Sequence, residues 1–278
     1  MSGRKKKLSL KLKKYNVLLI VALIVLMVLL AVLMIVKIFG NNDYYRVESR
    51  KDNIEKSKQQ DRDDYETIGW VRVQGTNIDY PLYGVIKDSY EYPVTESYLW
   101  SLNMDSKFHE TMITYGHNVM NLGPNPIAHD DNFTRMEELM NFVYYDFAQE
   151  NQYIQLSMNG EDYLYKIMAV NFMTVSDFDE YPEGEWATED KDKYIERLFK
   201  ESIYDYDVVY TQTDKVISVV TCSRFFTDGQ NYDFIITGRL VKAGEDISKS
   251  SVRRNKNYEK IDTILKGAEA DEKSVDNA

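Results

Sequence analysis

The sequence predicts a mostly-β domain with a few peripheral helices, preceded by one transmembrane helix. Residues 153–175 alternate apolar and polar side chains on both sides of Asn159-Gly160, which is typical of a β-hairpin. Two further runs rich in β-branched residues, 215–222 and 233–242, have the length and composition of strands. A closed barrel would leave such strands without exposed edges, so it is the architecture we expect.

The membrane helix is predicted from an uninterrupted apolar segment. Residues 17–36 are twenty residues without a polar side chain, enough for a helix to cross a hydrocarbon layer about 30 Å thick. A cleaved signal peptide is the alternative, but its apolar region is usually shorter and a small-residue cleavage site follows it. Here Lys37-Ile38-Phe39 follows, which favours an uncleaved anchor over residues 15–39.

Charge is distributed unevenly along the chain. Residues 1–14 contain seven basic residues and no acidic one. The rest of the chain therefore contains 27 basic residues and all 45 acidic ones. A basic cluster before a membrane helix stays in the cytoplasm, which places the acidic remainder outside the cell. A surface this acidic repels phosphate backbones, so we expect no nucleic-acid partner.

Three segments follow the predicted anchor. The highly charged residues 40–66 lack proline and indicate a helical stalk, and residues 67–243 form the extracellular domain. Residues 244–278 are polar and charged, and we expect a tail with little regular structure. Within the domain, apolar residues at helical spacing predict helices over 133–147 and 189–202.

Two shorter strands are expected near the start of the domain. Strand-forming residues between Ile68 and Gly84 flank the turn residues Gly75-Thr76-Asn77. The apolar run 112–119 predicts a strand that ends at Gly116-His117-Asn118, before a loop rich in proline, glycine and Asx residues.

Cys222 is the only cysteine of the 278 residues, and it lies at the end of a predicted strand. It has no intrachain disulfide partner, so it pairs with another chain, is inert in the core, or is a reactive thiol. An imidazole near a thiol activates it by ion pairing or by accepting its proton. His117 also ends a strand and is the candidate, whereas His109 and His129 lie in polar stretches and are expected to be exposed.

The spacing of these residues leaves a structural alternative open. Cys222 and His117 are far apart in the chain, and a buried small thiol and a buried imidazole with a backbone partner would explain both. One cysteine and three scattered histidines show no metal-ligand spacing, so we expect no metal site. No cofactor is expected either.

Several motifs together resemble those of the sortases, membrane-anchored cysteine transpeptidases of Gram-positive bacteria. They are IGWVRVQGTNIDYPL, ITYGHN, VVTC and GRLVK, in this order between Ile68 and Lys242. The helix expected over 189–202, just before the cysteine strand, and the helical stalk are similar to class B members. The resemblance implies an eight-stranded sortase β-barrel with peripheral helices.

The resemblance also implies a chemistry. Cys222 would be the nucleophile that attacks a Thr–Gly-type or Thr–Asn-type bond in the sorting signal of a surface protein or pilin. His117 would protonate the leaving amine of the cleaved bond and then activate an incoming amine. That amine would belong to a peptidoglycan precursor or to a pilin lysine. No cofactor takes part.

One position departs from the family pattern. Sortases carry an arginine on the strand after the cysteine, where it stabilises the oxyanion, and alignment of FIITGRL places Asp233 there. Arg224, two residues past Cys222, is the candidate replacement, whereas Arg239 lies too far along the strand. If neither serves, the implied alternative is a catalytically impaired sortase-like protein that binds envelope proteins.

Overall fold

The computed structural model describes the chain in two compact units, Met1–Tyr44 and Tyr45–Ala278. The described residues are 23–29, 47–61, 65–85, 99–101, 107–130, 135–174, 188–226 and 230–275. Residues 23–29 form a helix in the first unit, and most of the predicted basic tail and anchor lies outside the described residues. Across the described part of the chain, no helix is long and apolar enough to span a membrane.

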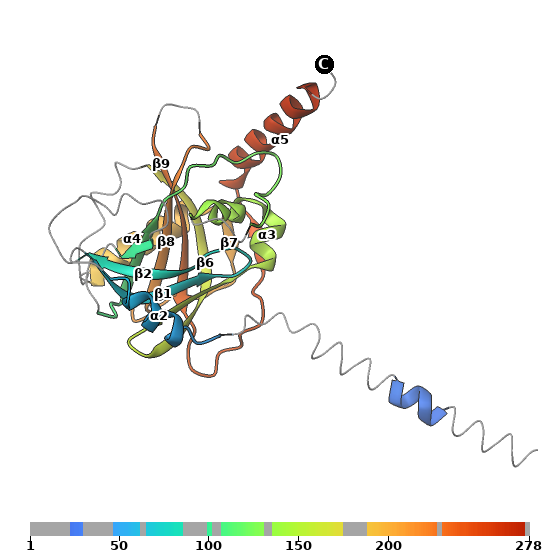
Figure 1. Cartoon of the computed structure of the whole chain (residues 1–278). Helices are drawn as coiled ribbons and strands as arrows, with labels where there is room; N and C mark the ends of the chain where they lie inside the picture. Colours follow the sequence, from blue (N-terminus) through green and yellow to red (C-terminus); the bar gives the residue numbers. More distant parts are fainter. Residues whose placement is uncertain are drawn as a thin grey trace, which may run out of the picture. The chain divides into compact units, whose positions relative to one another are not determined.

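Eight strands of the second unit close into a barrel, as predicted (Figure 1). Their order around the barrel is β1-β2-β3-β4-β8-β9-β6-β5. The pairs β2–β3 and β4–β8 are parallel, and the other pairs are antiparallel. The strands are β1 (Tyr65–Val73), β2 (Asp79–Val85), β3 (Leu99–Ser101), β4 (Thr111–Gly116), β5 (Tyr153–Met158), β6 (Glu161–Thr174), β8 (Val216–Ser223) and β9 (Tyr232–Leu240).

Two tight turns fix the register of the barrel strands. Asn159 and Gly160 have φ of 56° and 81°, the left-handed conformation that a two-residue hairpin needs between β5 and β6. Gly75, with φ of 77°, turns the chain between β1 and β2. A Cβ atom at Gly75 would lie 2.3 Å from Oδ1 of Asn151, so only glycine fits this turn.

Alternation of apolar residues along the strands fills one continuous core. The core includes residues of β1, β2, β4, β5, β6, β8 and β9, and its side chains are at most 1% exposed at Val71, Leu82, Met112, Ile154, Leu156, Ile167, Val219 and Ile236. This burial supplies the main driving force for folding, at about 25 cal/mol per Å² of apolar surface.

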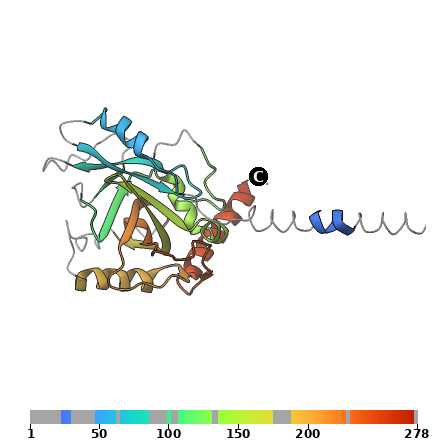
Figure 2. The same ribbon diagram turned by 90° about the horizontal axis from the view of Figure 1, so that it is seen from below.

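Two helices cover opposite sides of the barrel (Figure 2): α2 (Lys51–Lys58) and α4 (Thr188–Glu201). The helix predicted over 189–202 is therefore confirmed. α4 presents Tyr194 and Leu198 to the barrel, and both are buried. Tyr194 Oη lies 2.9 Å from Ser218 Oγ, which attaches the helix to the strand that carries the cysteine.

The helix predicted over 133–147 is wrong in its form. Residues Glu137–Val143 form the 3-10 helix η1, and Tyr145–Glu150 form the short helix α3. Tyr144 between them is extended, with φ of −83° and ψ of 124°. An α-helix was expected because its apolar residues would form one amphipathic face. Instead, all seven residues of η1 are buried, so tertiary packing on every side of the segment fixes its backbone.

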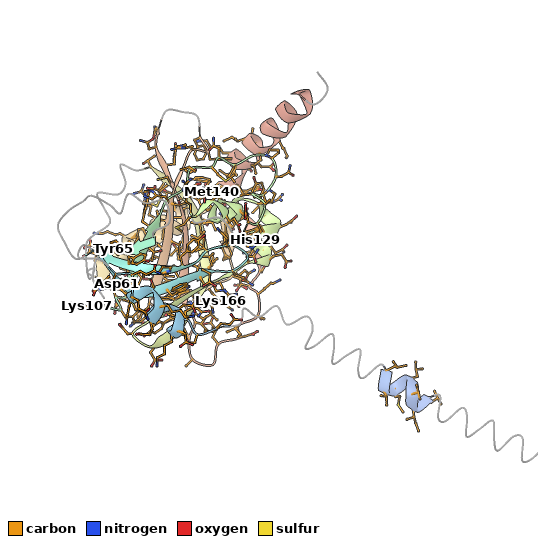
Figure 3. All side chains as sticks on the ribbon, in the orientation of Figure 1. Asp61, Tyr65, Lys107, His129, Met140 and Lys166 are labelled. Atoms are coloured by element: carbon orange, nitrogen blue, oxygen red, sulfur yellow. The ribbon has the colours of Figure 1, made fainter. Side chains whose placement is uncertain are left out.

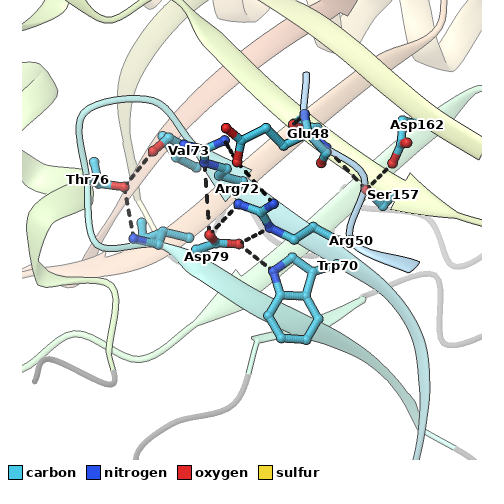
Figure 4. Close-up of polar contacts among 11 residues, drawn as sticks. Glu48, Arg50, Trp70, Arg72, Val73, Thr76, Asp79, Ser157 and Asp162 are labelled. Atoms are coloured by element: carbon cyan, nitrogen blue, oxygen red, sulfur yellow. Dashed lines mark hydrogen bonds and ion pairs between the residues drawn. The ribbon is translucent and has the colours of Figure 1, made fainter. Parts of the chain in front are cut away.

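The expected stalk does not stand apart from the domain in its described part. α2 has eight residues and packs against β1 and β2. Before it, Arg50 donates two hydrogen bonds to Asp79, of 2.8 and 2.7 Å, and Trp70 Nε1 donates to the same carboxylate at 2.6 Å (Figure 4). Ser57 Oγ lies 2.9 Å from Thr67 Oγ1. These contacts make the segment part of the barrel unit.

Residues 244–278 also carry more structure than expected. Strand β10 (Val252–Arg254) pairs with β7 (Tyr204–Tyr206), and α5 (Tyr258–Val275) follows it. Tyr258 is buried and stacks near Tyr204, with 5.3 Å between ring centroids. A few buried aromatic and aliphatic side chains thus attach this segment to the rest of the domain, although its average composition is polar.

Candidate active site

Strands β4 and β8 end side by side and make the two predicted residues neighbours. Their parallel register pairs Gly116 with Thr221, and Thr221 Oγ1 donates a 2.7 Å hydrogen bond to the Gly116 carbonyl oxygen. His117 and Cys222 are the next residues on the two chains. Since paired strands lie about 4.8 Å apart, the imidazole and the thiol belong to neighbouring strand ends.

Asn118 holds this arrangement. It is buried, and its Nδ2 donates a 2.9 Å hydrogen bond to the Cys222 carbonyl oxygen. Its Oδ1 accepts a 2.9 Å hydrogen bond from the Met120 amide. On the other side, the His117 carbonyl oxygen accepts a 2.9 Å hydrogen bond from the amide of Met136. The segment that follows β4 is therefore fixed against both the cysteine strand and η1.

The cysteine lies on the outer face of the barrel. Alternation along β8 places Ser218 and Cys222 on one face, and Ser218 contacts Tyr194 of the covering helix α4. Cys222 is half-buried, four residues beyond that contact. Cys222 therefore lies at the end of its strand and is not sealed in the core, as a nucleophile requires.

Tyr115 and Asp233 flank the thiol. Tyr115 Oη lies 2.8 Å from Cys222 Sγ and 3.2 Å from Asp233 Oδ1. Asp233 is the residue opposite Cys222 in the β8–β9 ladder, and it is 1% exposed. Its second oxygen, Oδ2, is buried without a hydrogen-bond partner among the described residues. The alignment that placed a carboxyl group beside the thiol is thus matched by the strand register.

Burial controls the protonation of both flanking groups. It raises the pKa of Asp233 to about 7, and the hydrogen bond from Tyr115 only partly opposes this shift. Burial, together with the negative charges of Asp233 and Cys222, raises the pKa of Tyr115 above its usual range. Tyr115 therefore keeps its proton, whereas Asp233 exchanges its proton near neutral pH.

His117 is half-buried, and its pKa is shifted the other way. Burial lowers the pKa of the imidazole, and the positive charge of Arg135 lowers it further. Arg135 comes just before η1, where its Nη1 lies 3.8 Å from Glu137 Oε1. The structure thus places a guanidinium group near the imidazole that sequence reasoning did not consider.

The two arginines weighed from the sequence have different surroundings. Arg224 is exposed, and its Nη1 donates a 3.3 Å hydrogen bond to the Val119 carbonyl oxygen. It therefore joins the segment that follows Cys222 to the segment that follows His117. Arg239 is 3% exposed and bound to Glu245, with 2.7 Å between Nη2 and Oε1. It is paired at the far end of β9, opposite Val216.

The other two histidines lie outside this cluster. His129 is the exposed residue that was expected, and its Nδ1 lies 2.9 Å from Glu138 Oε2 (Figure 3). The expectation for His109 was wrong, because it is only 3% exposed. It lies two residues before β4, where the chain enters the packed core. Within the described ranges, no group of three His, Cys, Asp or Glu side chains is arranged to hold a metal ion.

Sequence reasoning missed three residues of the site. Tyr115 and Asn118 lie within two residues of His117, inside the quoted motif ITYGHN, and their polar side chains are the signal that was available. Arg135 gave no such signal, because the folding of the loop between β4 and η1 alone brings it near His117.

The fold, with a thiol and an imidazole at neighbouring strand ends, resembles that of the class B sortases. Sortase B of Clostridium perfringens aligns with a TM-score of 0.53 and 20% identity, over 68% of this chain and 100% of that one. Sortase B of Staphylococcus aureus aligns with a TM-score of 0.53 and 16% identity, over 71% and 89%. No protein-family model matches the sequence, and no curated protein matches it in sequence. The chain therefore has a sortase B-like fold.

Proposed function

We propose that the chain is a sortase-type cysteine transpeptidase. The observation that carries the proposal is the parallel register of β4 and β8, which makes His117 and Cys222 neighbours at the strand ends. The sortase B-like fold supports it. The half-buried sulfur on the outer face is where an extended peptide would reach it.

In this reaction the Cys222 sulfur attacks a threonine carbonyl carbon in a sorting signal. The carbon–nitrogen bond breaks, His117 in its protonated form donates a proton to the leaving amine, and a thioester joins the peptide to the sulfur. An incoming amine then attacks the thioester and loses a proton to His117. The products are a new amide bond, the Cys222 thiolate and the imidazolium of His117.

The partners follow from this chemistry. Two solved structures with a similar fold contain bound molecules. One is Staphylococcus aureus sortase B with a substrate, and the other is a sortase B with Gly3. For this chain we propose surface proteins or pilins with a sorting signal as donors, and an amine of a peptidoglycan precursor or pilin lysine as acceptor. Arg224 is our candidate for binding the substrate carbonyl oxygens, because its guanidinium spans the segments after Cys222 and His117.

The test uses the full chain in detergent and two fluorogenic peptides, one with a central Thr–Gly bond and one with a Thr–Asn bond. We expect cleavage of one peptide, a thioester adduct on Cys222 by mass spectrometry, and an amide product when triglycine is added. Cys222→Ala should abolish all three. Cleavage that persists in Cys222→Ala would exclude the proposed nucleophile.

A second candidate is favoured by Asp233. A carboxyl group, 1% exposed, lies beside the sulfur where sortases have an arginine, and its negative charge would oppose an oxyanion. The chain would then be a sortase-like protein that binds envelope proteins with little turnover. It predicts that both peptides bind without forming a thioester adduct.

We also propose that the catalytic domain lies outside the cell. The support is the sequence: the basic residues 1–14 would remain in the cytoplasm, and residues 15–39 would anchor the chain in the membrane. Protease treatment of intact cells tests this orientation. We expect the domain 67–243 to be digested and a tag placed before residue 1 to be protected.

A further inference from the structure

The thiol has two neighbours whose roles the proposed reaction leaves open. Tyr115 Oη stands between the sulfur and Asp233, 2.8 Å from Sγ and 3.2 Å from Oδ1. A hydroxyl group both accepts and donates a hydrogen bond, so these two distances describe a continuous chain from thiol to carboxyl group. The strand register sets this chain, because Cys222 and Asp233 are direct partners in the β8–β9 ladder.

We propose that Tyr115 and Asp233 form the proton path that ionises Cys222. The Cys222 S–H bond breaks, its electron pair stays on the sulfur, and the proton binds Tyr115 Oη. At the same time the Tyr115 O–H bond breaks, and that proton binds Asp233 Oδ1. The balance is a thiol and a carboxylate before the transfer, a thiolate and a carboxylic acid after it, and an unchanged tyrosine. The inference rests on the proposed role of Cys222 as nucleophile.

The surroundings favour Asp233 over His117 as the first acceptor. Burial raises the pKa of Asp233 to about 7, whereas burial and the charge of Arg135 lower the pKa of His117. A carboxyl group that holds its proton more tightly than the nearby imidazole is the better base. Tyr115, whose own pKa is raised by burial, passes the proton on without keeping the charge.

The groups that face Asp233 are compatible with this role. β8 contributes Cys222 opposite it, β6 contributes the apolar Met173 as its other ladder partner, and β4 contributes Tyr115. Its oxygen Oδ2 is buried without a hydrogen-bond partner among the described residues, which disfavours a permanent negative charge. A carboxyl group in such a place is stabilised by taking up a proton.

Proton transfer also removes the electrostatic conflict at this position. A carboxylate beside the sulfur would repel the oxyanion that forms when the thiolate attacks. After it accepts the thiol proton, Asp233 is neutral. His117 then binds a proton from solvent and supplies it to the leaving amine. Asp233 must be a carboxylate before the transfer, and His117 must be an imidazolium when the amine leaves. Because the pKa of His117 is the lower of the two, only a minor fraction of the chain holds both forms at once, and this fraction, and with it the cleavage rate, is largest between the two pKa values.

The test is the rate at which iodoacetamide alkylates Cys222 in the full chain, followed by mass spectrometry. Because the chain has one cysteine, the signal has one source. Between about pH 5 and pH 9 we expect the wild-type rate to rise near pH 7 and then level off, because the pair shares one proton over that range. In Asp233→Asn and Tyr115→Phe the rate should instead keep rising to about pH 8.5, where free thiols ionise, so the ratio of the rates at pH 9 and pH 7 should be about tenfold larger than in wild type.

Two control variants match these changes at sites remote in the fold. Asp205→Asn alters an exposed strand carboxyl group on β7, and Tyr163→Phe removes a hydroxyl group from β6. Both should keep the wild-type alkylation profile. Circular dichroism shows whether each variant is folded, and Tyr115→Phe keeps the test decisive if Asp233→Asn is not. A folded Asp233→Asn or Tyr115→Phe variant whose alkylation rate levels off above pH 7 as in wild type would overturn the proposal.

The alkylation assay needs no peptide substrate, so its outcome is separate from that of the proposed function. A chain that alkylates as expected but never forms a thioester keeps the proton path and loses the transpeptidase. A chain that cleaves peptide but shows no effect of Asp233→Asn on alkylation keeps the transpeptidase and loses the proton path.

Discussion

Cys222 and Asp233 lie opposite one another in the antiparallel ladder of β8 and β9, and Tyr115 Oη bridges their side chains. A buried carboxyl group next to a thiol is an unusual neighbour for a nucleophile. The arrangement has consequences for the stability of the fold as well as for the reaction.

The first prediction concerns stability and pH. Because the pKa of Asp233 is raised from 3.8 to about 7 in the folded chain, the folded state binds this proton more tightly than the unfolded state. Its contribution to the free energy of unfolding is fully present below about pH 4 and is lost as the pH rises through about 7. The slope between these values is at most about 1.4 kcal/mol per pH unit.

Urea unfolding of wild type and Asp233→Asn at several pH values measures this contribution. The stability of the variant relative to wild type should increase steadily from pH 4 to pH 7.5. Asp205→Asn, which changes an exposed carboxyl group, should show no such trend. A constant difference for Asp233→Asn across the range would contradict a raised pKa.

The second prediction concerns Asn118, which fastens the segment after β4 to the cysteine strand. Asn118→Ala removes the 2.9 Å hydrogen bond to the Cys222 carbonyl oxygen. We expect the rate of thioester formation to fall about tenfold or more, because a misplaced imidazole loses reactive geometry. The binding constant of an uncleaved peptide should change much less. Asn257→Ala, which removes an amide from a loop near α5, should leave both quantities unchanged.

The sequence predicted the barrel well where local pattern and packing agree. The hairpin around Asn159-Gly160 and the existence of the strands that carry Cys222 and Asp233 have clear signals, and the structure confirms them. The helix over 133–147 was wrong because all of η1 is buried, and a pattern of apolar residues cannot distinguish the two helix types there. The sequences around α2 and α5 are highly charged, so the few buried contacts that attach these helices to the barrel unit could not be predicted from composition.

The candidate site shows the same limit. Cys222 and His117 were found because a thiol and an imidazole at strand ends carry chemical meaning on their own. Arg135 carries none until the fold brings it near the imidazole, and Tyr115 had only its position beside His117 as a signal. Long-range register, which places Asp233 opposite Cys222, is the information that local sequence lacks.

The third prediction concerns the segment before the barrel. Arg50 is held by a bidentate interaction with Asp79, and its side chain is only 13% exposed. Arg50→Ala should lower the free energy of unfolding by about 1–3 kcal/mol, because it leaves the partly buried Asp79 carboxylate with only the longer, 4.0 Å ion pair to Arg72. Hydrogen exchange in residues 51–58 should increase strongly.

The matched control is Lys58→Ala, which breaks an exposed ion pair with Glu55 in the same helix. Its effect on stability should stay below about 1 kcal/mol. If residues 51–58 exchange at the same rate in Arg50→Ala as in wild type, α2 is held by its other contacts, and the Arg50–Asp79 pair is not what docks it.

The fourth prediction concerns the C-terminal segment. Glu245 accepts hydrogen bonds from Arg239, which lower the pKa of Glu245 to about 2, and Arg239 is only 3% exposed. The contribution of this pair to stability is present above about pH 4.5 and is lost as the pH falls through about 2. Glu245→Gln should cost about 2 kcal/mol at pH 7, because it leaves a buried guanidinium without a counter-charge. The difference in stability between the variant and wild type should also shrink as the pH falls toward 2.

The matched control is Glu150→Gln, which breaks a pair in which the glutamate is 68% exposed. It should change stability by less than about 1 kcal/mol. Equal effects of the two variants in urea unfolding at pH 7 would mean that the Arg239 pair does not anchor the chain after β9.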